Sequence, residues 1–378
     1  MKKLYVVLFF MLSFAETNAQ QITEKKLLAL EKLGNAIDST LFNNDASYFD
    51  KAFHIKTFTD RFFIKSNDPE LVEFNQGFHN GFSKSFSFGN EILNVTNSGS
   101  EYNFLKAYRA EGNYYLLFRL SGEVGINYHQ HLIKFIDNKP RIIDSYIYVT
   151  GEYLSQTMKT IYNLSVNNRS FLKRLLNVDE IKDLKKLASL KQLRDEGKYN
   201  EVVDLYESLS DTSKKKKIFK IYALTSAQYL SNEVYNKYIN EYKAEFPNDP
   251  SLHLISIDGF ILKKQFDKAL ASIDKLEQTI GGDDFLQFFR GNIYYLKKDY
   301  KKAEEKFSYV IENYENFFDA YDSLLTVYVE SSNFKEATVL LDKLLEKFEM
   351  KKEDFKAVLE ETFEEFSKSS EFKNWLKK

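Results

Sequence analysis

Cysteine is absent from all 378 residues, and proline (4), glycine (14) and tryptophan (1) are scarce. Without thiols the chain can form no disulfide and no thiolate metal site, and it has no cysteine nucleophile or cysteine-linked lipid anchor. The chain also lacks an excess of charge of either sign, because 53 Lys and Arg nearly cancel 55 Asp and Glu. The balance gives no basic excess for nucleic acid, so a nucleic-acid partner is not expected.

What the chain has instead is 29 % charged and 16 % aromatic residues, with 34 Phe and 25 Tyr. Few helix breakers among many charged and large aromatic side chains favour long helices that pack through those large side chains. The length predicts two or three domains.

The first 19 residues have the order of a secretory signal peptide. Lys2 and Lys3 are followed by an apolar run over residues 4–14 and by small residues at Thr17-Asn18-Ala19. This order predicts export, with a periplasmic or secreted product. No later run approaches the ~18 apolar residues of a membrane span. We therefore expect no transmembrane segment after signal removal.

Residues 20–152 change from a helical period to a period of two. Apolar residues recur at helical spacing up to about Leu93, and Asp68-Pro69-Glu70 predicts a helix start. From Tyr102 onward apolar and polar residues alternate, which predicts antiparallel strands. Turn signals at Glu111-Gly112-Asn113 and at residues 137–140 separate those strands. The pattern predicts an α+β domain.

This element order, with the closing run at residues 140–148, resembles the NTF2-like (cystatin-like) fold. The resemblance implies helices packed into the concave face of a curved sheet, in a module that docks a partner or holds a small ligand. A helical linker over residues 153–181 is expected to follow.

Residues 182–378 contain a repeat of 34 residues. The recurring positions are an aromatic at Phe266, Tyr300 and Phe334 and an alanine at Ala269, Ala303 and Ala337. Two antiparallel helices approach within about 8–10 Å only where a small side chain allows it, and Gly291 supplies a second small position. The pattern resembles the tetratricopeptide repeat, with degenerate copies before residue 250 and an irregular C-terminal cap. The predicted fold is therefore an α+β domain followed by an all-α solenoid.

The resemblance implies a binding groove on the concave surface, lined by the first helix of each hairpin. The predicted groove residues are Leu254, Asp258, Ile261, Phe285, Phe288, Asn292, Tyr295, Asp322 and Thr326. One subtype of the family grips a partner's C-terminal carboxylate with Lys and Asn. Asn292 fits that subtype, but Phe288 stands where Lys is needed, so we expect an apolar or aromatic segment as the ligand. Packing between repeats is the alternative role of the aromatics.

A second candidate pocket comes from His129 and His131, which share one face of a predicted strand, and from Asp144 on the next strand. Two imidazoles could ligate a metal or act with a carboxylate in acid–base chemistry. Locally hydrogen-bonded sheet histidines are the simpler interpretation. No third ligand follows from the spacing, and no phosphate loop, nucleophile elbow or dinucleotide fingerprint occurs. We therefore predict no metal and no cofactor.

The sequence thus favours an exported protein-interaction scaffold that is not an enzyme. Its partner would be another protein or peptide segment in the envelope or outside the cell. Two alternatives stay open. One is a small-molecule-binding or enzymatic N-terminal domain recruited by the solenoid, and the other is a self-assembling structural element.

Overall fold

A computed structural model describes residues 23–122, 125–166 and 178–378. The predicted signal peptide lies outside these ranges, as does part of the predicted linker. The chain divides into two compact units, the first reaching to Ile255 and the second running from Ser256 to Lys378. Nowhere in the ranges just given is a helix both long and apolar enough to cross a membrane.

The first unit contains a five-stranded antiparallel sheet in which every strand pairs with its sequence neighbour. Two of its hairpins close with two-residue turns in which both residues have positive φ, at Glu111-Gly112 (50° and 80°) and Asp137-Asn138 (50° and 59°). This turn geometry matches the right-handed twist of paired strands. The strands are β1 (Glu101–Ala110), β2 (Asn113–Gly122), β3 (Gly125–Ile136), β4 (Lys139–Ile147) and β5 (Glu152–Tyr153).

Helices that precede the sheet in the sequence pack on one of its faces and bury an aromatic core. At its centre, the Phe49 ring lies 5.4 Å from Phe88 and 6.3 Å from Phe118 between ring centroids. Asp68 begins a 17-residue helix as predicted, because its carboxylate accepts from the Leu71 backbone N–H and Pro69 occupies the first turn. The helices are one over residues 23–42, α2 (Ser47–Ala52), α3 (Ile55–Thr59), α4 (Pro69–Ser85) and α5 (Phe88–Thr96).

Helices continue the first unit after the sheet. They are α6 (Leu154–Val166), α7 (Val178–Asp195), α8 (Tyr199–Glu207), α9 (Asp211–Lys214), α10 (Lys217–Ala227) and α11 (Asn232–Glu245). The structure confirms the coarse prediction of an antiparallel sheet with helices followed by an all-helical region.

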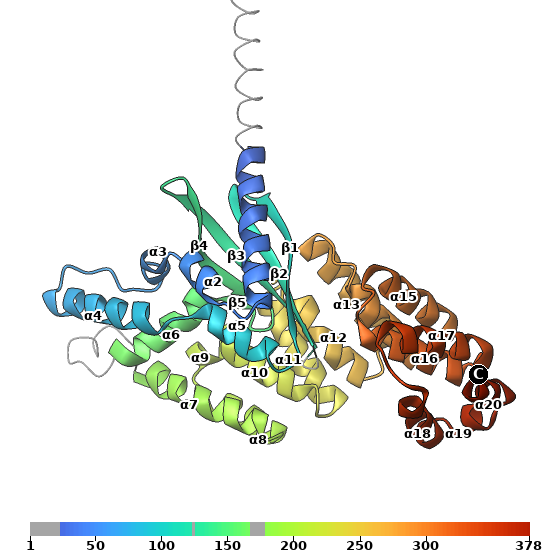
Figure 1. Ribbon diagram of the computed structural model, residues 1–378. Helices are drawn as coiled ribbons and strands as arrows, with labels where there is room; N and C mark the ends of the chain where they lie inside the picture. Colours follow the sequence, from blue (N-terminus) through green and yellow to red (C-terminus); the bar gives the residue numbers. More distant parts are fainter. Residues whose placement is uncertain (1–22, 123–124, 167–177) are drawn as a thin grey trace, which may run out of the picture. The chain divides into compact units, whose positions relative to one another are not determined.

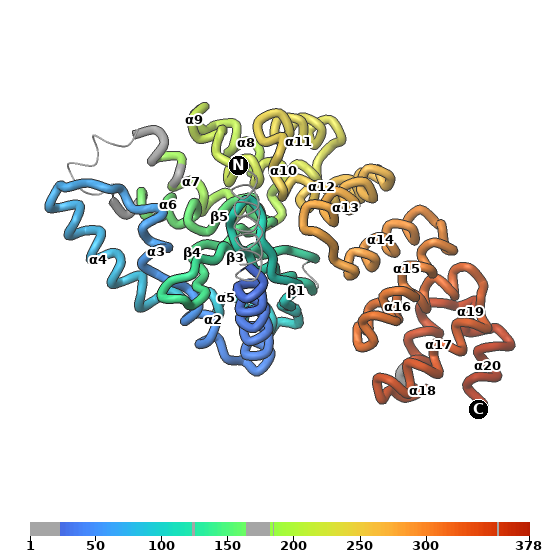
Figure 2. Tube along the Cα trace, turned by 90° about the horizontal axis from the view of Figure 1, so that it is seen from above, coloured from blue at the N-terminus to red at the C-terminus, as the bar shows by residue number. Residues whose placement is uncertain are grey.

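Helical hairpins make up the second unit, one after another along the chain (Figure 2). Helix α12 (Leu252–Leu262) contains the point of division between the two units. The helices that follow are α13 (Phe266–Ile280), α14 (Leu286–Leu296), α15 (Tyr300–Asn313), α16 (Phe318–Glu330), α17 (Phe334–Lys347), α18 (Lys352–Thr362), α19 (Glu364–Lys368) and α20 (Ser370–Lys377). Trp375, on α20, is 2 % exposed and closes the C-terminal core.

Candidate functional site

Four turns between helices share one left-handed closure. Gly197, Lys264, Lys298 and Ser332 have φ of 71°, 55°, 60° and 60°. After each, a backbone N–H donates to the carbonyl five residues earlier, as from Gln265 to Phe260 at 2.8 Å. This is the hydrogen bond of a Schellman-type helix end. Three of the turns use residues with a side chain, for which the left-handed region is unfavourable by about 1 kcal/mol or more. The recurrence at 34-residue intervals therefore reflects a repeated packing of the flanking helices.

The small residues of the repeat lie where two helices of a hairpin meet. Ala269, Ala303 and Ala337 are fully buried. A Cβ added to Gly291 on α14 would stand 2.5 Å from Cε1 of Phe307 on α15, closer than real Cβ contacts. The Phe307 ring therefore occupies the space that the missing side chain leaves. The second helix of each hairpin begins at the repeated aromatic, since α13, α15 and α17 start at Phe266, Tyr300 and Phe334.

The predicted groove residues recur at equivalent places on the first helix of each hairpin. Asp258, Asn292 and Thr326 are 34 residues apart on α12, α14 and α16, and Asp322 lies one turn before Thr326. Asp258 and Asp322 are exposed, and the other two are half-buried. The partly or fully exposed members of the predicted set are Asp258, Ile261, Phe288, Asn292, Tyr295, Asp322 and Thr326.

The two carboxylates of the predicted groove are exposed, and their pKa values are shifted. Desolvation raises the pKa of Asp258, and desolvation followed by repulsion from Asp319 raises the pKa of Asp322. Neither carboxylate takes part in an ion pair within the described part of the chain. The face thus carries negative charge that a cation of a partner could neutralise.

Two predicted groove positions are corrected by their burial. Leu254 is 7 % exposed and Phe285 is 4 % exposed, so neither side chain is available to a partner. The Phe285 ring packs against Phe317 with 5.0 Å between ring centroids. Phe288, although half-buried, lies 4.9 Å from the same ring. Phe285 therefore has the alternative role considered above, packing between repeats, and Phe288 shares part of that role.

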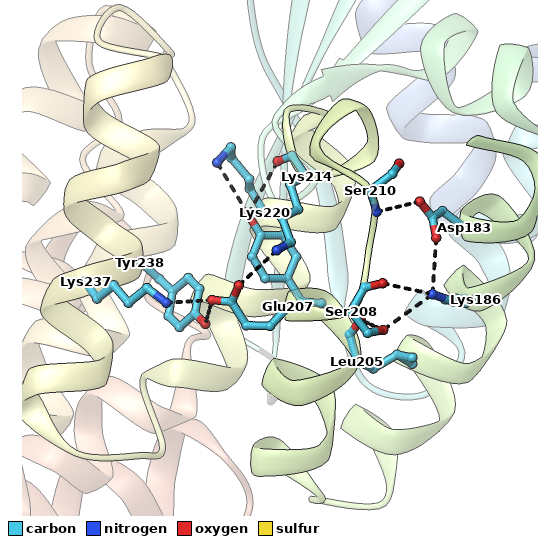
Figure 3. Close-up of polar contacts among 11 residues, drawn as sticks. Asp183, Lys186, Leu205, Glu207, Ser208, Ser210, Lys214, Lys220, Lys237 and Tyr238 are labelled. Carbon is cyan, nitrogen blue, oxygen red and sulfur yellow. Dashed lines mark hydrogen bonds and ion pairs between the residues drawn. The ribbon is translucent and has the colours of Figure 1, made fainter. Parts of the chain in front are cut away.

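In the first unit, the polar side chains of α8 to α11 bind one another (Figure 3). Glu207 accepts hydrogen bonds from Lys237 at 2.6 Å, from Tyr238 at 2.7 Å and from Lys214 at 3.1 Å. Burial alone would raise the pKa of Glu207, but these donors hold it at about 2. Lys214 is the first of four consecutive lysines at residues 214–217, and its charge is paired with Glu207 within the fold.

A second polar cluster joins the sheet to α10 and α11. Asp249, which is 6 % exposed, accepts from the Tyr146 hydroxyl of β4 at 2.7 Å and pairs with Lys217 of α10 at 2.8 Å. The Tyr242 hydroxyl of α11 donates to the other carboxylate oxygen. A buried carboxylate with these partners is stable only while all of them stay in place. Asp249 thereby holds α10 and α11 against β4.

His129 and His131 lie on the same sheet face, as predicted, inside the aromatic core and with 5 % and 0 % exposure. Asn127 fixes their protonation. Its Oδ1 accepts from the backbone N–H groups of Tyr128 and Val149, so its Nδ2 must be the donor to His129 Nε2 at 3.0 Å. His129 Nδ1–H then donates to the Tyr102 hydroxyl at 3.2 Å.

The same chain of hydrogen bonds continues through the second histidine. The Tyr102 hydroxyl donates to His131 Nε2 at 2.9 Å, and His131 Nδ1–H donates to Ser145 Oγ at 2.7 Å. Both imidazoles are thereby satisfied in their neutral form. Burial lowers the pKa of His129 to about 4, and burial with the nearby His129 lowers the pKa of His131 well below its usual value. The arrangement links three strands of the sheet, β1, β3 and β4.

Asp144 binds partners other than the histidines. Its Oδ2 accepts from Arg61 Nε at 2.6 Å and from the Ser155 hydroxyl at 2.6 Å, and its Oδ1 accepts from the Ser155 backbone N–H at 3.1 Å. The carboxylate thus caps the start of α6 and pairs with the helical layer. No group of three or more His, Cys, Asp or Glu side chains suited to hold a metal occurs in the ranges that the structure describes.

Three participants in these clusters were not anticipated from the sequence. Tyr102 meets His131 from β1, two strands away, Ser145 meets it from the neighbouring β4, and Asp249 meets Tyr146 across 103 residues. The strand register could have placed Ser145 opposite His131. Nothing in the sequence pairs Asp249 with β4.

Comparison of this chain with known proteins gives no match to a family model, a curated protein or a solved structure.

Proposed function

We propose that this chain is an exported interaction scaffold, in which tetratricopeptide-type hairpins hold a partner and an NTF2-like domain supports them. Export rests on the order of charged, apolar and small residues in the first 19 positions. The scaffold role rests on the hairpin repeat, which presents equivalent side chains at 34-residue intervals. Repeats of this kind bind extended or helical segments along one face.

The observation that carries the proposal is the pair of exposed carboxylates on that face, at Asp258 on α12 and Asp322 on α16. Asp258 and Asp322 have raised pKa values, with neither in an ion pair within the described residues. Between them in the sequence, Phe288, Asn292 and Tyr295 give α14 a half-buried mixed face. The best-fitting ligand is therefore an apolar or aromatic segment that also carries Lys or Arg. The sequence alone predicts an apolar or aromatic ligand segment, and the two carboxylates add a basic side chain to it.

Photo-crosslinking in the native host tests this assignment by position. A photoreactive amino acid at Asn292 or at Thr326 should give the same crosslinked partner, because both lie at one repeat position. The matched control is Val339 on α17, which is 51 % exposed on the second helix of its hairpin. It should give no such product.

A charge-reversal pair then tests the chemistry. Asp322→Lys should lower the crosslinking yield from Thr326 at least tenfold, whereas Glu346→Lys, an exposed acid on α17, should leave it unchanged. Equal crosslinking yields from Thr326 and Val339, or equal effects of the two charge reversals, would refute partner binding on this face.

The alternative of a catalytic N-terminal pocket gains no support from the two histidines. Both are buried, neutral and hydrogen-bonded on both ring nitrogens. A general base needs a ring nitrogen that is free to take a proton from a substrate.

A further inference from the structure

A cleft of about 380 Å³ opens between the helix over residues 23–42, α2 and the start of β4. Aliphatic side chains, Pro140 and Tyr48 line it. The lining also includes the cations of Lys32, Lys51, Lys139 and Arg141. No acidic residue lines it. In a protein whose charges nearly cancel, four cations around one small cleft are a local excess.

Backbone pairing holds this cleft in shape. The chain that leaves α2 forms a parallel bridge from Phe53 to Ile142 on β4, and the His54 N–H donates to the Ile142 carbonyl at 2.8 Å. Next to that bridge, Arg141 Nη1 donates to the Lys51 carbonyl at 2.6 Å. α2 therefore cannot move away from β4 without breaking these bonds. The Arg141 guanidinium is held beside the Lys51 backbone, and both side chains line the cleft.

The four cations are not neutralised inside the fold. None of them forms an ion pair within the ranges that the structure describes. Asp45 interacts with the Lys51 charge, but it binds the Ser47 backbone and is not part of the cleft. The lysines of the α8–α11 cluster differ, because each has a carboxylate partner. Like charges kept together without a counter-ion are typical of a binding site for an anion.

We propose that this cleft binds a soluble phosphate monoester that carries a ring. The Arg141 guanidinium, oriented by its bond to the Lys51 carbonyl, offers its remaining donors in the planar fork that suits phosphate. The lysines supply the charge that balances a dianion. Tyr48 is 42 % exposed and offers an aromatic face to the ring of the ester. The volume lies in the range of small-molecule sites.

Calorimetric titration of the full chain with phenyl phosphate tests the proposal. Lys51→Gln with Lys139→Gln should weaken binding at least tenfold and leave the Arg141 anchor intact, since that anchor is a backbone carbonyl. The matched control, Lys25→Gln with Lys84→Gln, removes two exposed lysines outside the cleft and should change affinity less than twofold. Wild-type affinity should fall at least tenfold between 50 and 500 mM salt.

Two further probes distinguish binding of the phosphate group from binding of the ring and from binding to a membrane surface. Tyr48→Leu should weaken phenyl phosphate at least threefold and leave inorganic phosphate unchanged, and phenol should not bind. No heat of binding at 5 mM phenyl phosphate, or equal losses in the cleft and control variants, would overturn the proposal. It would also be overturned by lysine-dependent binding to phosphatidylglycerol vesicles without binding of phenyl phosphate, because the cations would then serve a membrane surface.

Discussion

Replacement of Gly291 by alanine should loosen the hairpin formed by α14 and α15. The added methyl group would stand 2.5 Å from Cε1 and 2.8 Å from Cδ1 of Phe307, a ring that is 1 % exposed. Forcing a methyl group into such a packed site costs about 1–3 kcal/mol. Alanine in place of glycine stabilises a helix by about 1 kcal/mol. The net expectation is a destabilisation of about 1 kcal/mol.

A matched substitution should have the opposite sign. Gly77 on α4 is also inside a helix, but nothing lies within 4 Å of an added Cβ. Gly77→Ala should therefore stabilise its helix by about 1 kcal/mol. The two variants should differ by about 2 kcal/mol, or roughly thirtyfold in a local opening constant.

Hydrogen exchange by mass spectrometry suits this comparison, because it reports each helix separately in a chain with two compact units. Amides of α14 and α15 should exchange faster in Gly291→Ala, and amides of α4 should exchange more slowly in Gly77→Ala. Slower exchange in α14 of Gly291→Ala would refute the close approach of Gly291 and Phe307.

Three other substitutions test the polar clusters and the C-terminal cap. Asp249→Asn leaves Lys217 without its buried counter-ion and should lower the free energy of unfolding of the first unit by about 3 kcal/mol in urea titrations. His129 has a folded pKa of about 4, below its unfolded value, so the unfolded chain binds more protons between pH 6.5 and 4. Stability should therefore fall by up to about 3 kcal/mol as the pH drops through this window, and His129→Gln should flatten the fall seen by circular dichroism. Trp375→Phe removes the bond from indole Nε1 to Asp342 at 2.6 Å and should speed amide exchange in α20, for a loss of about 1–2 kcal/mol.

Local signals in the sequence were sufficient for the turns and helix starts. The two-residue turns follow from Gly112, Asp137 and Asn138, which tolerate positive φ. The Asp68-Pro69 pair fixes the start of α4. The 34-residue interval likewise anticipates where α13, α15 and α17 begin. Each of these features depends on neighbours within a few residues or on simple periodicity.

Features that depend on distant side chains were not accessible in this way. The carboxylate of Asp249 meets Tyr146 only because α10 and α11 pack on the sheet. Phe285 was assigned to the groove from its repeat position, and it is buried because Tyr314 and Phe317 happen to be aromatic. The basic cleft combines three segments, each of which alone is an ordinary solvated surface.

Protection from hydrogen exchange on addition of the crosslinked partner would test the scaffold proposal most directly. We predict slower exchange in α12, α14 and α16, which carry Asp258, Asn292 and Thr326, and no change in α13, α15 and α17. Protection confined to the second helices, or found only in the first 152 residues, would contradict it.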